Sequence, residues 1–312
     1  MIFLITGCAG FIGSHLCERL LKENHIVHGI DNLNNYYDIN QKNNNLNILK
    51  KFNNFYFYQE DIINSNRINL IPNINVVINL AAMAGVRTSL DKPKMYIRTN
   101  IEGQVNLLEQ CVKNNIPKFI YASSSSVYGM NKKIPFNEND LISKVNSPYA
   151  ASKRSGEIMA QLYNQLYGIS VIGLRFFTVY GPRGRPDMAP FKFLNSISKG
   201  KKFDKYGKGD SYRDYTYIDD IINGIIAVID CEKKCEIYNL GNSKTVSLNE
   251  FINTCEIITN KKAVFNQLPE QKGDVPYTYS DISKAKKDLN YNPNINLKDG
   301  LIKMFNWMKL KN

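Results

Sequence analysis

The sequence predicts an α/β protein with a Rossmann-type, doubly wound parallel sheet and a smaller C-terminal α/β domain. Three observations lead to this prediction. Short apolar runs alternate with segments of helical spacing over residues 1–175, and a glycine-rich turn joins the first run to the first helix. After Arg175 the composition shifts toward Gly, Pro, Arg and Asp. Strands that alternate with helices are typical of βαβ units in a parallel sheet.

The first predicted unit is strand, glycine turn, helix, strand. Residues 2–6 are an apolar run, residues 14–22 have helical spacing, and residues 26–30 form a second apolar run. Residues 32–54 are rich in Asn, Tyr and Lys and predict a loop with a polar helix. The later elements follow the same alternation, with strands at 55–58, 76–81, 119–123 and 171–175 and long helices at 93–114 and 148–167.

Composition and charge exclude several classes of protein. The 312 residues carry 40 Lys and Arg against 28 Asp and Glu, a net charge of +12. This charge is spread along the chain, so we expect a basic surface that attracts anionic substrates and no nucleic-acid partner. No apolar run approaches the ~20 residues of a membrane span, and glycines interrupt the N-terminal run, so we expect a cytoplasmic protein without a membrane contact.

The metal-binding and nucleophilic residue types are too few or badly spaced for several other chemistries. The six cysteines form neither a disulfide framework nor a zinc spacing. The three histidines lie together within the first 28 residues. We therefore expect no metal site and no Ser-His-Asp triad.

The motif Gly7-Cys8-Ala9-Gly10-Phe11-Ile12-Gly13 predicts a dinucleotide site. Glycine is needed where the chain turns tightly and the backbone approaches a pyrophosphate, and the following helix N-terminus favours phosphate. Asp31 ends the second strand, at about the 20-residue distance from which a carboxylate accepts a bond from the adenosine ribose 2′-hydroxyl. No Arg stands beside it, which favours NAD over NADP. The alternative is a turn aspartate, because Asp31-Asn32 also suits a loop.

Tyr149 and Lys153 form the candidate chemical centre. They lie one turn apart on a predicted helix that begins at Pro148, so both side chains share one face. A lysine there favours the phenolate, which can accept a proton from a sugar hydroxyl while hydride leaves for a nicotinamide. Tyr128 and Lys132 have the same spacing, but Gly129 and Asn131 predict a loop there.

Four serines, residues 123–126, follow a predicted buried strand. One interpretation is loop chemistry through local hydrogen bonds. The functional interpretation is a hydroxyl that positions the substrate and shares its proton, for which Ser124 is the first candidate and Ser126 the second.

Taken together, these motifs resemble the extended short-chain dehydrogenase/reductase family along nearly the whole chain. The resemblance rests on the glycine motif, residues 79–82, residues 121–129, the Tyr149/Lys153 pair and residues 213–220. It implies a homodimer formed by the helices at 93–114 and 148–167. It also implies an NAD-binding domain over 1–175, to which 216–240 returns, and a mainly substrate-binding domain over 176–312. The implied NAD-binding residues are Gly7, Gly10, Phe11, Ile12, Gly13, Asp31, Asn32, Asn35, Asp61, Ile62, Leu80, Ala81, Ala82, Ala84, Asn100, Ala122, Tyr149, Lys153, Phe176 and Val179.

Residues 174–189 and 84–87 resemble the UDP-glucuronate 4-epimerase subgroup. UDP-glucose 4-epimerases and the dehydratases usually carry Asn where Thr178 stands. The chain departs from the subgroup at Arg183, where a Trp is often found, and at Met83, which replaces a Gln. The implied substrate residues are Arg87, Ser124, Ser125, Thr178, Arg185, Met188, Arg213 and Asp274.

The resemblance implies a 4-epimerisation of a UDP-sugar. Tyr149 removes the C4 hydroxyl proton, hydride passes from C4 to NAD, and the 4-keto sugar turns over before hydride returns to its other face. The family's decarboxylases and dehydratases place an acidic residue in the segment that matches residues 124–126, where this chain has hydroxyls. The alternatives are a UDP-glucose or UDP-N-acetylglucosamine 4-epimerase, a UDP-glucuronate decarboxylase, and an NAD-sensing scaffold without activity.

Overall fold

The computed structural model describes residues 1–270 and 274–310 and divides into two compact units. Unit 1 contains the N-terminal part of the chain and two later segments. Unit 2 contains most of the C-terminal part and one short loop from the N-terminal part. The segments of unit 1 are Met1–Met130, Leu141–Arg175 and Ile225–Tyr238, and those of unit 2 are Asn131–Asp140, Phe176–Gly224 and Asn239–Asn312.

A seven-stranded sheet in the order β10-β6-β5-β4-β1-β2-β3 forms the centre of unit 1. β1 pairs in parallel with both β2 and β4, so the chain moves outward from β1 in both directions. This reversal is the topological switch point at which such sheets bind ligands beyond their strand ends. The strands are β1 (Ile2–Thr6), β2 (Ile26–Ile30), β3 (Phe55–Tyr58), β4 (Val76–Asn79), β5 (Lys118–Ser124), β6 (Ser170–Phe176) and β10 (Cys235–Leu240).

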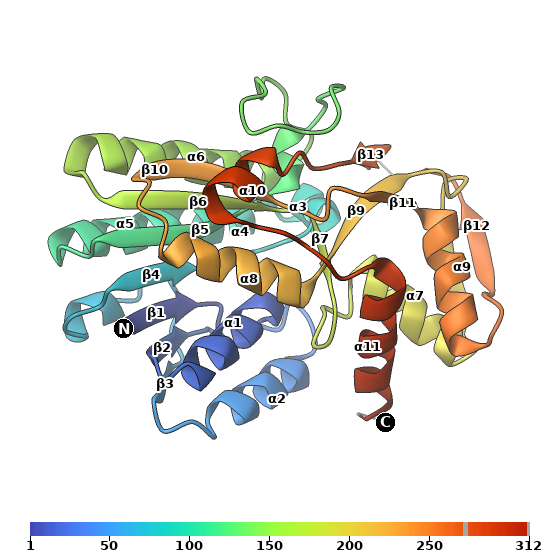
Figure 1. Cartoon of the computed structure of the whole chain (residues 1–312), viewed down its shortest axis with the longest axis horizontal. Coiled ribbons are helices and arrows are strands. Elements are labelled where there is room, and N and C mark those ends of the chain that lie inside the picture. Colours follow the sequence, from blue (N-terminus) through green and yellow to red (C-terminus); the bar gives the residue numbers. More distant parts are fainter. Residues whose placement is uncertain (271–273, 311–312) are drawn as a thin grey trace. The chain divides into compact units, whose positions relative to one another are not determined.

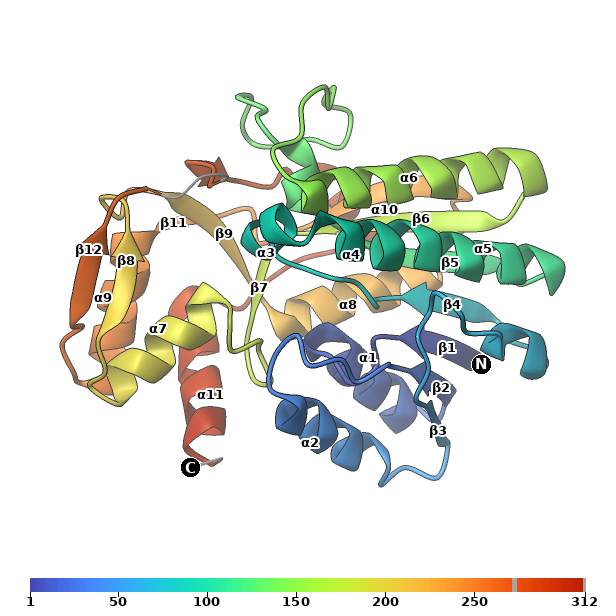
Figure 2. The same ribbon diagram turned by 180° about the vertical axis from the view of Figure 1, so that it is seen from behind.

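Helices cover both faces of this sheet. Helices α1 (Phe11–Lys22) and α2 (Ile39–Leu49) lie on the face seen in Figure 1. Helices α5 (Gly103–Lys113) and α6 (Pro148–Tyr167) lie on the opposite face (Figure 2). Buried side chains such as Val77, Phe119 and Leu107 fill the layer between the sheet and the second pair. The predicted doubly wound α/β fold is confirmed.

Helix α6 begins where the sequence predicts. Ser147 is its N-cap, and the Ser147 side chain accepts a hydrogen bond from the Ala150 N–H, while Pro148 stands in the first turn. Gly168 ends the helix in the left-handed conformation, which glycine adopts easily because it has no Cβ. The helix therefore presents the i and i+4 positions 149 and 153 on one face.

The long helix predicted over 93–114 is interrupted at its centre. The chain forms α4 (Pro93–Ile97), then a π-helical turn η2 (Arg98–Glu102), and then α5. A π turn inserts an extra residue, which redirects the side chains at that point, and such turns are frequent at functional sites. Here it contains the buried Asn100. The predicted helix is therefore confirmed over nearly its whole length, with a π turn that the sequence analysis did not foresee.

Unit 2 is built from small sheets and helices around an aromatic core. In one sheet, β9 (Tyr212–Tyr217) pairs with β7 (Thr178–Tyr180), β11 (Thr245–Ser247) and β13 (Tyr277–Thr278). Strands β8 (Phe203–Tyr206) and β12 (Phe265–Leu268) form a second sheet. The Phe193 ring contacts the rings of Phe203 and Phe251. The helices with residues in this unit are α7 (Ala189–Ser198), α8 (Ile218–Ile229), α9 (Leu248–Thr259), α10 (Ser283–Leu289) and α11 (Leu297–Lys309).

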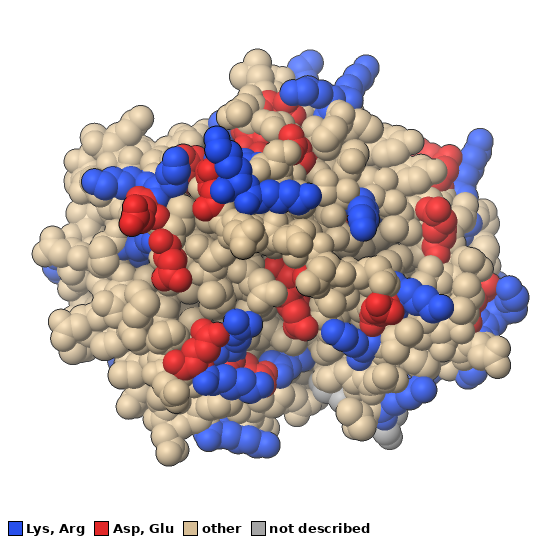
Figure 3. All heavy atoms as spheres, in the orientation of Figure 1, with Lys and Arg blue, Asp and Glu red and all other residues tan. Residues whose placement is uncertain are grey.

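Three shorter helical segments complete the described structure: η1 (Arg67–Leu70), α3 (Val86–Asp91) and η3 (Ser125–Tyr128). On the face shown in Figure 3, Lys and Arg side chains are interspersed with Asp and Glu. None of the six cysteines, all of which lie within the described residues, forms a disulfide. Across residues 1–270 and 274–310, none of the helices has the length and apolar character that a membrane span requires.

Candidate active site

The glycine turn after β1 forms a backbone surface that excludes side chains. Gly7 has φ +70°, and a Cβ there would lie 2.8 Å from the Ala81 nitrogen, while a Cβ on Gly13 would overlap the Gly7 carbonyl. Gly10 is the N-cap of α1, and no side chain in the described part of the chain caps that helix N-terminus. The turn thus leaves N–H groups and a partial positive charge for an anion.

Asp31 lies buried at the end of β2, beside the glycine turn. Its carboxylate accepts hydrogen bonds from the Ala9 N–H at 3.2 Å and the Leu33 N–H at 2.9 Å. The structure also places a cation there that the sequence analysis missed. The Lys42 ammonium, from α2, lies 3.4 Å from Asp31 Oδ1 and donates to Asn34 Oδ1 at 3.1 Å. Lys42 is 5% exposed, so Asp31 belongs to a buried ion pair.

The other predicted cofactor residues near Asp31 have different environments. The Asn32 amide donates to Asp61 Oδ2 at 2.8 Å, so the structure brings these two residues together. Asn35 is exposed, and Ile62 is part of the hydrophobic core. Asn45 on α2 is a second residue that the sequence analysis missed. Its side-chain amide donates to the Ala9 carbonyl at 2.9 Å and so stabilises the glycine turn.

The segment after β4, residues 80–84, is held by hydrogen bonds from three separate parts of unit 1. The Ala81 N–H donates to Thr6 Oγ1 at 3.1 Å, and the Ala84 carbonyl accepts from Tyr36 Oη at 2.6 Å. Asn100 exchanges two bonds with the Met83 backbone and donates to Ser152 Oγ at 2.9 Å. Leu80 and Ala82 are partly exposed along this segment. The π turn therefore ties this segment to the start of α6.

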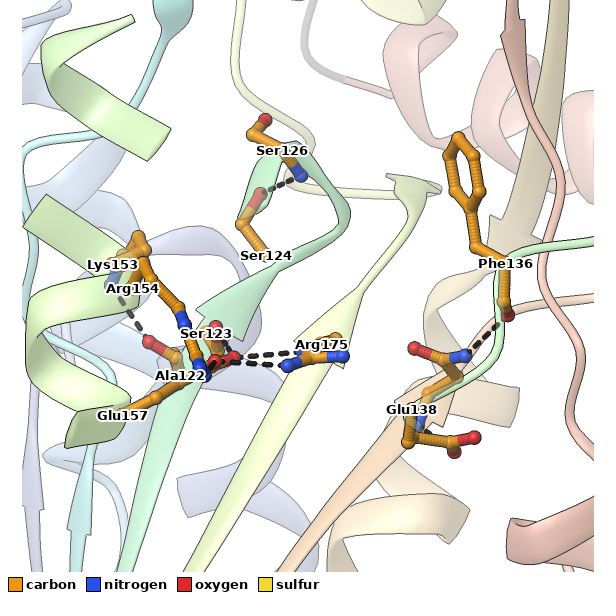
Figure 4. Close-up of polar contacts among 11 residues, drawn as sticks. Ala122, Ser123, Ser124, Ser126, Phe136, Glu138, Lys153, Arg154, Glu157 and Arg175 are labelled. Carbon is orange, nitrogen blue, oxygen red and sulfur yellow. Dashed lines mark hydrogen bonds and ion pairs between the residues drawn. The ribbon is translucent and has the colours of Figure 1, made fainter. Parts of the chain in front are cut away.

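Tyr149 and Lys153 lie on the first two turns of α6. The Tyr149 ring makes an edge contact with Tyr96, with centroids 6.0 Å apart, and its carbonyl accepts from Ser152 Oγ at 2.8 Å. The Lys153 ammonium donates to the Ala122 carbonyl at 2.8 Å (Figure 4). Burial lowers the pKa of Lys153 to about 8, although the Glu157 carboxylate acts in the opposite direction. A pKa of about 8 leaves the Lys153 side chain mainly charged at neutral pH.

The serine run divides into residues with different contacts. Ser123, on β5, is buried and donates to Glu157 Oε1 at 2.7 Å. Ser124 is the N-cap of η3, where its hydroxyl accepts from the Ser126 N–H at 3.1 Å. Ser125 and Ser126 are partly exposed. The structure therefore shows the local capping bond of Ser124, the last residue of β5, and the functional interpretation of the run stays a prediction.

The predicted substrate residues of unit 2 lie on β7, β9 and their loops. Thr178 begins β7, next to Phe176 at the end of β6, and Val179 follows it. Arg213, on β9, donates to the Tyr212 carbonyl at 2.9 Å and lies 3.4 Å from the Pro276 carbonyl, in the segment that contains the exposed Asp274. Strand β13 pairs Thr278 with Arg213, which fixes this proximity.

Arg185 has a partner that the sequence analysis did not foresee. Asp187, two residues later, accepts from Arg185 Nε at 3.1 Å and from Nη2 at 2.6 Å. Met188 caps the N-terminus of α7 just beyond this pair. The other predicted arginine, Arg87 in unit 1, is exposed on α3. An anionic ligand of Arg185 would therefore compete with, or add to, the Asp187 contact.

The fold and these residues define a dinucleotide-binding α/β protein with a Tyr/Lys pair on one face of a helix. A glycine turn, a strand-end aspartate and the pair on α6 belong to unit 1. The NAD dependent epimerase/dehydratase family model matches residues 3–241. The chain belongs to this family, as the resemblance of its motifs predicts.

Known relatives resemble the chain over almost all of its length. A UDP-glucuronate 4-epimerase of Thermodesulfobacterium geofontis is 45% identical, covering 98% of this chain and 96% of the relative. An uncharacterised protein of Methanocaldococcus jannaschii is 48% identical, covering 97% and 95%. The Bacillus cereus UDP-glucuronic acid 4-epimerase, solved with UDP-glucuronic acid and NAD, is similar with a TM-score of 0.95 and 39% identity, covering 100% of both chains.

Proposed function

We propose that this protein is an NAD-dependent UDP-glucuronate 4-epimerase. The observation that carries the proposal is the Tyr149/Lys153 pair on α6, which occurs together with a glycine turn and Asp31 in a member of the epimerase/dehydratase family. The substrate assignment is supported by the 45% identity to a relative of that name. We further propose that unit 1 holds NAD and that unit 2 contributes the contacts to the UDP-sugar.

The residues of unit 1 fit the dinucleotide. The backbone around Gly7 and Gly13 has no space for a Cβ, and the α1 N-terminus would receive the pyrophosphate. Asp31 would accept bonds from the adenosine ribose, with Asn32 and Asp61 beside it. NAD bound there would accept the hydride of the sugar C4 and return it.

Tyr149 is the proposed acid–base residue that takes up and returns the proton of the C4 hydroxyl. Its phenolate would accept the C4 hydroxyl proton as the C4 hydride departs, and the phenol would return a proton when the hydride comes back. Lys153, held by the Ala122 carbonyl, favours the phenolate through its charge. Ser124, with Ser126 as the second candidate, would hydrogen-bond the same hydroxyl and fix its orientation.

The substrate contacts proposed for unit 2 follow from the chemistry of UDP-glucuronate. Arg185 suits the sugar carboxylate or a nearby phosphate because a guanidinium binds either one in a bidentate manner. Thr178 would donate to the same carboxylate. Arg213 and Asp274 are the candidates for the diphosphate and the uridine ribose, and their segments lie together through β9 and β13.

The serine run favours epimerisation over decarboxylation. The 4-keto form of a uronic acid is a β-keto acid that loses carbon dioxide readily when an acid assists. Residues 124–126 offer hydroxyls in place of a carboxyl group. A UDP-pentose is therefore not the expected product.

A proton NMR time course tests the proposed function. Purified protein with UDP-glucuronate and no added NAD should produce UDP-galacturonate without a pentose, because the cofactor is regenerated in each turnover. Conversion of UDP-glucose with UDP-glucuronate unchanged would replace the substrate assignment. A lack of reaction with UDP-glucuronate, UDP-glucose and UDP-N-acetylglucosamine, even with NAD added, would refute the epimerase and support an NAD-sensing scaffold.

We also propose a homodimer formed through α6. Its residues Ile158, Leu162 and Leu166, spaced at i, i+4 and i+8, are 51%, 39% and 61% exposed. Ile97 on α4, a helix that packs against α6, is also exposed. An apolar stripe of this length on a described helix suits a second copy of the same stripe.

Light scattering should give twice the mass of one chain. The variant Leu162→Glu should shift the protein to the monomer, whereas Ile257→Glu, at a more exposed apolar position on α9, should not. A monomeric mass for the unaltered protein would contradict this proposal.

A cytoplasmic location is our further proposal, because free thiols persist in a reducing compartment.

A further inference from the structure

Two neighbouring residues of β5 are bonded to two successive turns of α6. The Ala122 carbonyl accepts from Lys153 Nζ at 2.8 Å, and Ser123 Oγ donates to Glu157 Oε1 at 2.7 Å. Figure 4 shows the two contacts close together between β5 and α6, and Ser124 is the next residue along the chain. Two hydrogen bonds therefore hold the end of β5, where Ser124 lies, against the helix face that carries Tyr149 and Lys153. Glu157 makes the second of these bonds.

Glu157 is held from the neighbouring strand as well. Arg175, at the end of β6, donates to Glu157 through Nε at 2.8 Å and Nη2 at 2.9 Å. Their side chains are 1% and 0% exposed. Arg154 donates to Oε2 at 2.8 Å from the same helix. The Glu157 carboxylate thus joins β5, β6 and α6, one helical turn after Lys153.

Stability alone does not require this arrangement. Replacement of a buried ion pair by well-packed apolar residues is often neutral or stabilising, because desolvation of the charges offsets their attraction. The Glu157 carboxylate stands one turn from Lys153, so its charge acts on the ammonium that supports the phenolate. The position of the pair therefore points to a role in the reaction as well as in packing.

We propose that Glu157 is a positioning residue of the epimerase reaction, which fixes Ser124 relative to Tyr149 and keeps Lys153 protonated. This inference rests on the proposed function of Tyr149 and Lys153. Glu157 contacts neither substrate nor cofactor in this role. It acts through Ser123 on the strand and through its charge on the lysine.

The charged groups around Lys153 determine in which direction loss of the Glu157 charge would move the pKa of that lysine. The charged and titratable groups packed around Glu157 and Lys153 are Tyr149 and Arg154 on α6, Tyr121 on β5, Tyr128 on η3, Arg175 on β6 and Tyr96 on α4. Burial lowers the pKa of Lys153 to about 8, and the negative charge of Glu157 raises it. Loss of that charge moves the pKa of Lys153 further down. Because the charged lysine is the active form, activity should then be lost at a lower pH.

The variant Glu157→Gln tests both parts of the proposal. We expect kcat at neutral pH to fall by about tenfold, with the KM for UDP-glucuronate unchanged. The alkaline limb of the kcat profile should move to lower pH by roughly one unit, the lower end of the shift that a nearby opposite charge produces. Ser123→Ala, which keeps the charge, should lower kcat without moving the limb. Glu23→Gln, which removes the carboxylate of an exposed ion pair at the end of α1, should change neither.

A folding defect would not hide the result. If Glu157→Gln leaves Arg175 unpaired and the protein does not fold, Glu157→Gln combined with Arg175→Gln removes both charges, and its limb should move in the same direction. An NMR titration of Lys153 in selectively labelled protein gives a readout without turnover, and the pKa of Lys153 should fall in the variant. An unchanged limb and an unchanged lysine pKa would overturn the role of Glu157. Absence of turnover in the unaltered protein would instead refute the proposed function.

Discussion

Replacement of Tyr149 by phenylalanine should abolish nearly all turnover while NAD still binds. The substitution removes one oxygen and preserves the ring that contacts Tyr96. The Lys153 bond to the Ala122 carbonyl does not involve that oxygen. Loss of a positioned general acid–base typically costs roughly 10²- to 10⁴-fold in rate, so kcat should fall by that factor.

The measurement is the NMR assay together with the absorbance of the bound nucleotide. Tyr167→Phe is the matched control, because it makes the same change on the same helix at a residue that is 56% exposed. We expect that control to keep normal activity. Near-normal turnover of Tyr149→Phe would remove the phenol from the mechanism, and loss of NAD from the variant would show that the substitution damages the site itself.

Elements defined by short-range patterns could be predicted from the sequence. The strands Ile2–Thr6 and Ile26–Ile30 and the glycine turn between them form as expected, because periodicity and glycine placement are local signals. Helix α6 begins at Pro148, behind a serine cap, for the same reason. The π turn of η2 could not be read in this way, since nothing in the helical periodicity of residues 93–114 indicates an inserted residue.

Residues that act through distant partners were missed. Lys42 and Asn45 lie in a polar segment without a clear apolar pattern, yet α2 places their side chains against Asp31 and the Ala9 carbonyl. Glu157 looks like an ordinary helix residue until the sheet brings Ser123 and Arg175 to it. Its position one turn after Lys153 was the available signal. For Arg185, the nearby Asp187 in the sequence was a signal that could have been used.

The Asp31/Lys42 pair changes what is expected from the loss of Asp31. The sequence favours NAD over NADP because no Arg stands beside Asp31. In the structure the carboxylate neutralises a buried ammonium 3.4 Å away. Asp31→Ala should therefore have two effects. NAD should bind roughly 10- to 100-fold more weakly, because a hydrogen bond to a charged group is worth about 1.5–3 kcal/mol. NADP binding should improve, because Lys42 loses its partner and can attract the phosphate.

Calorimetric titration of nucleotide-free protein with NAD and with NADP separates these effects. Asp31→Ala should reverse or erase the preference for NAD, whereas Asp31→Ala combined with Lys42→Met should bind NAD weakly and lose the gain for NADP. Because the two side chains are in contact, the effects should be non-additive, and the double variant measures that coupling. If NADP binds equally well to the single and the double variant, Lys42 has no part in cofactor choice. Unchanged NAD affinity in Asp31→Ala would mean that the aspartate serves the turn, since its bonds to the Ala9 and Leu33 backbone would then be its whole role.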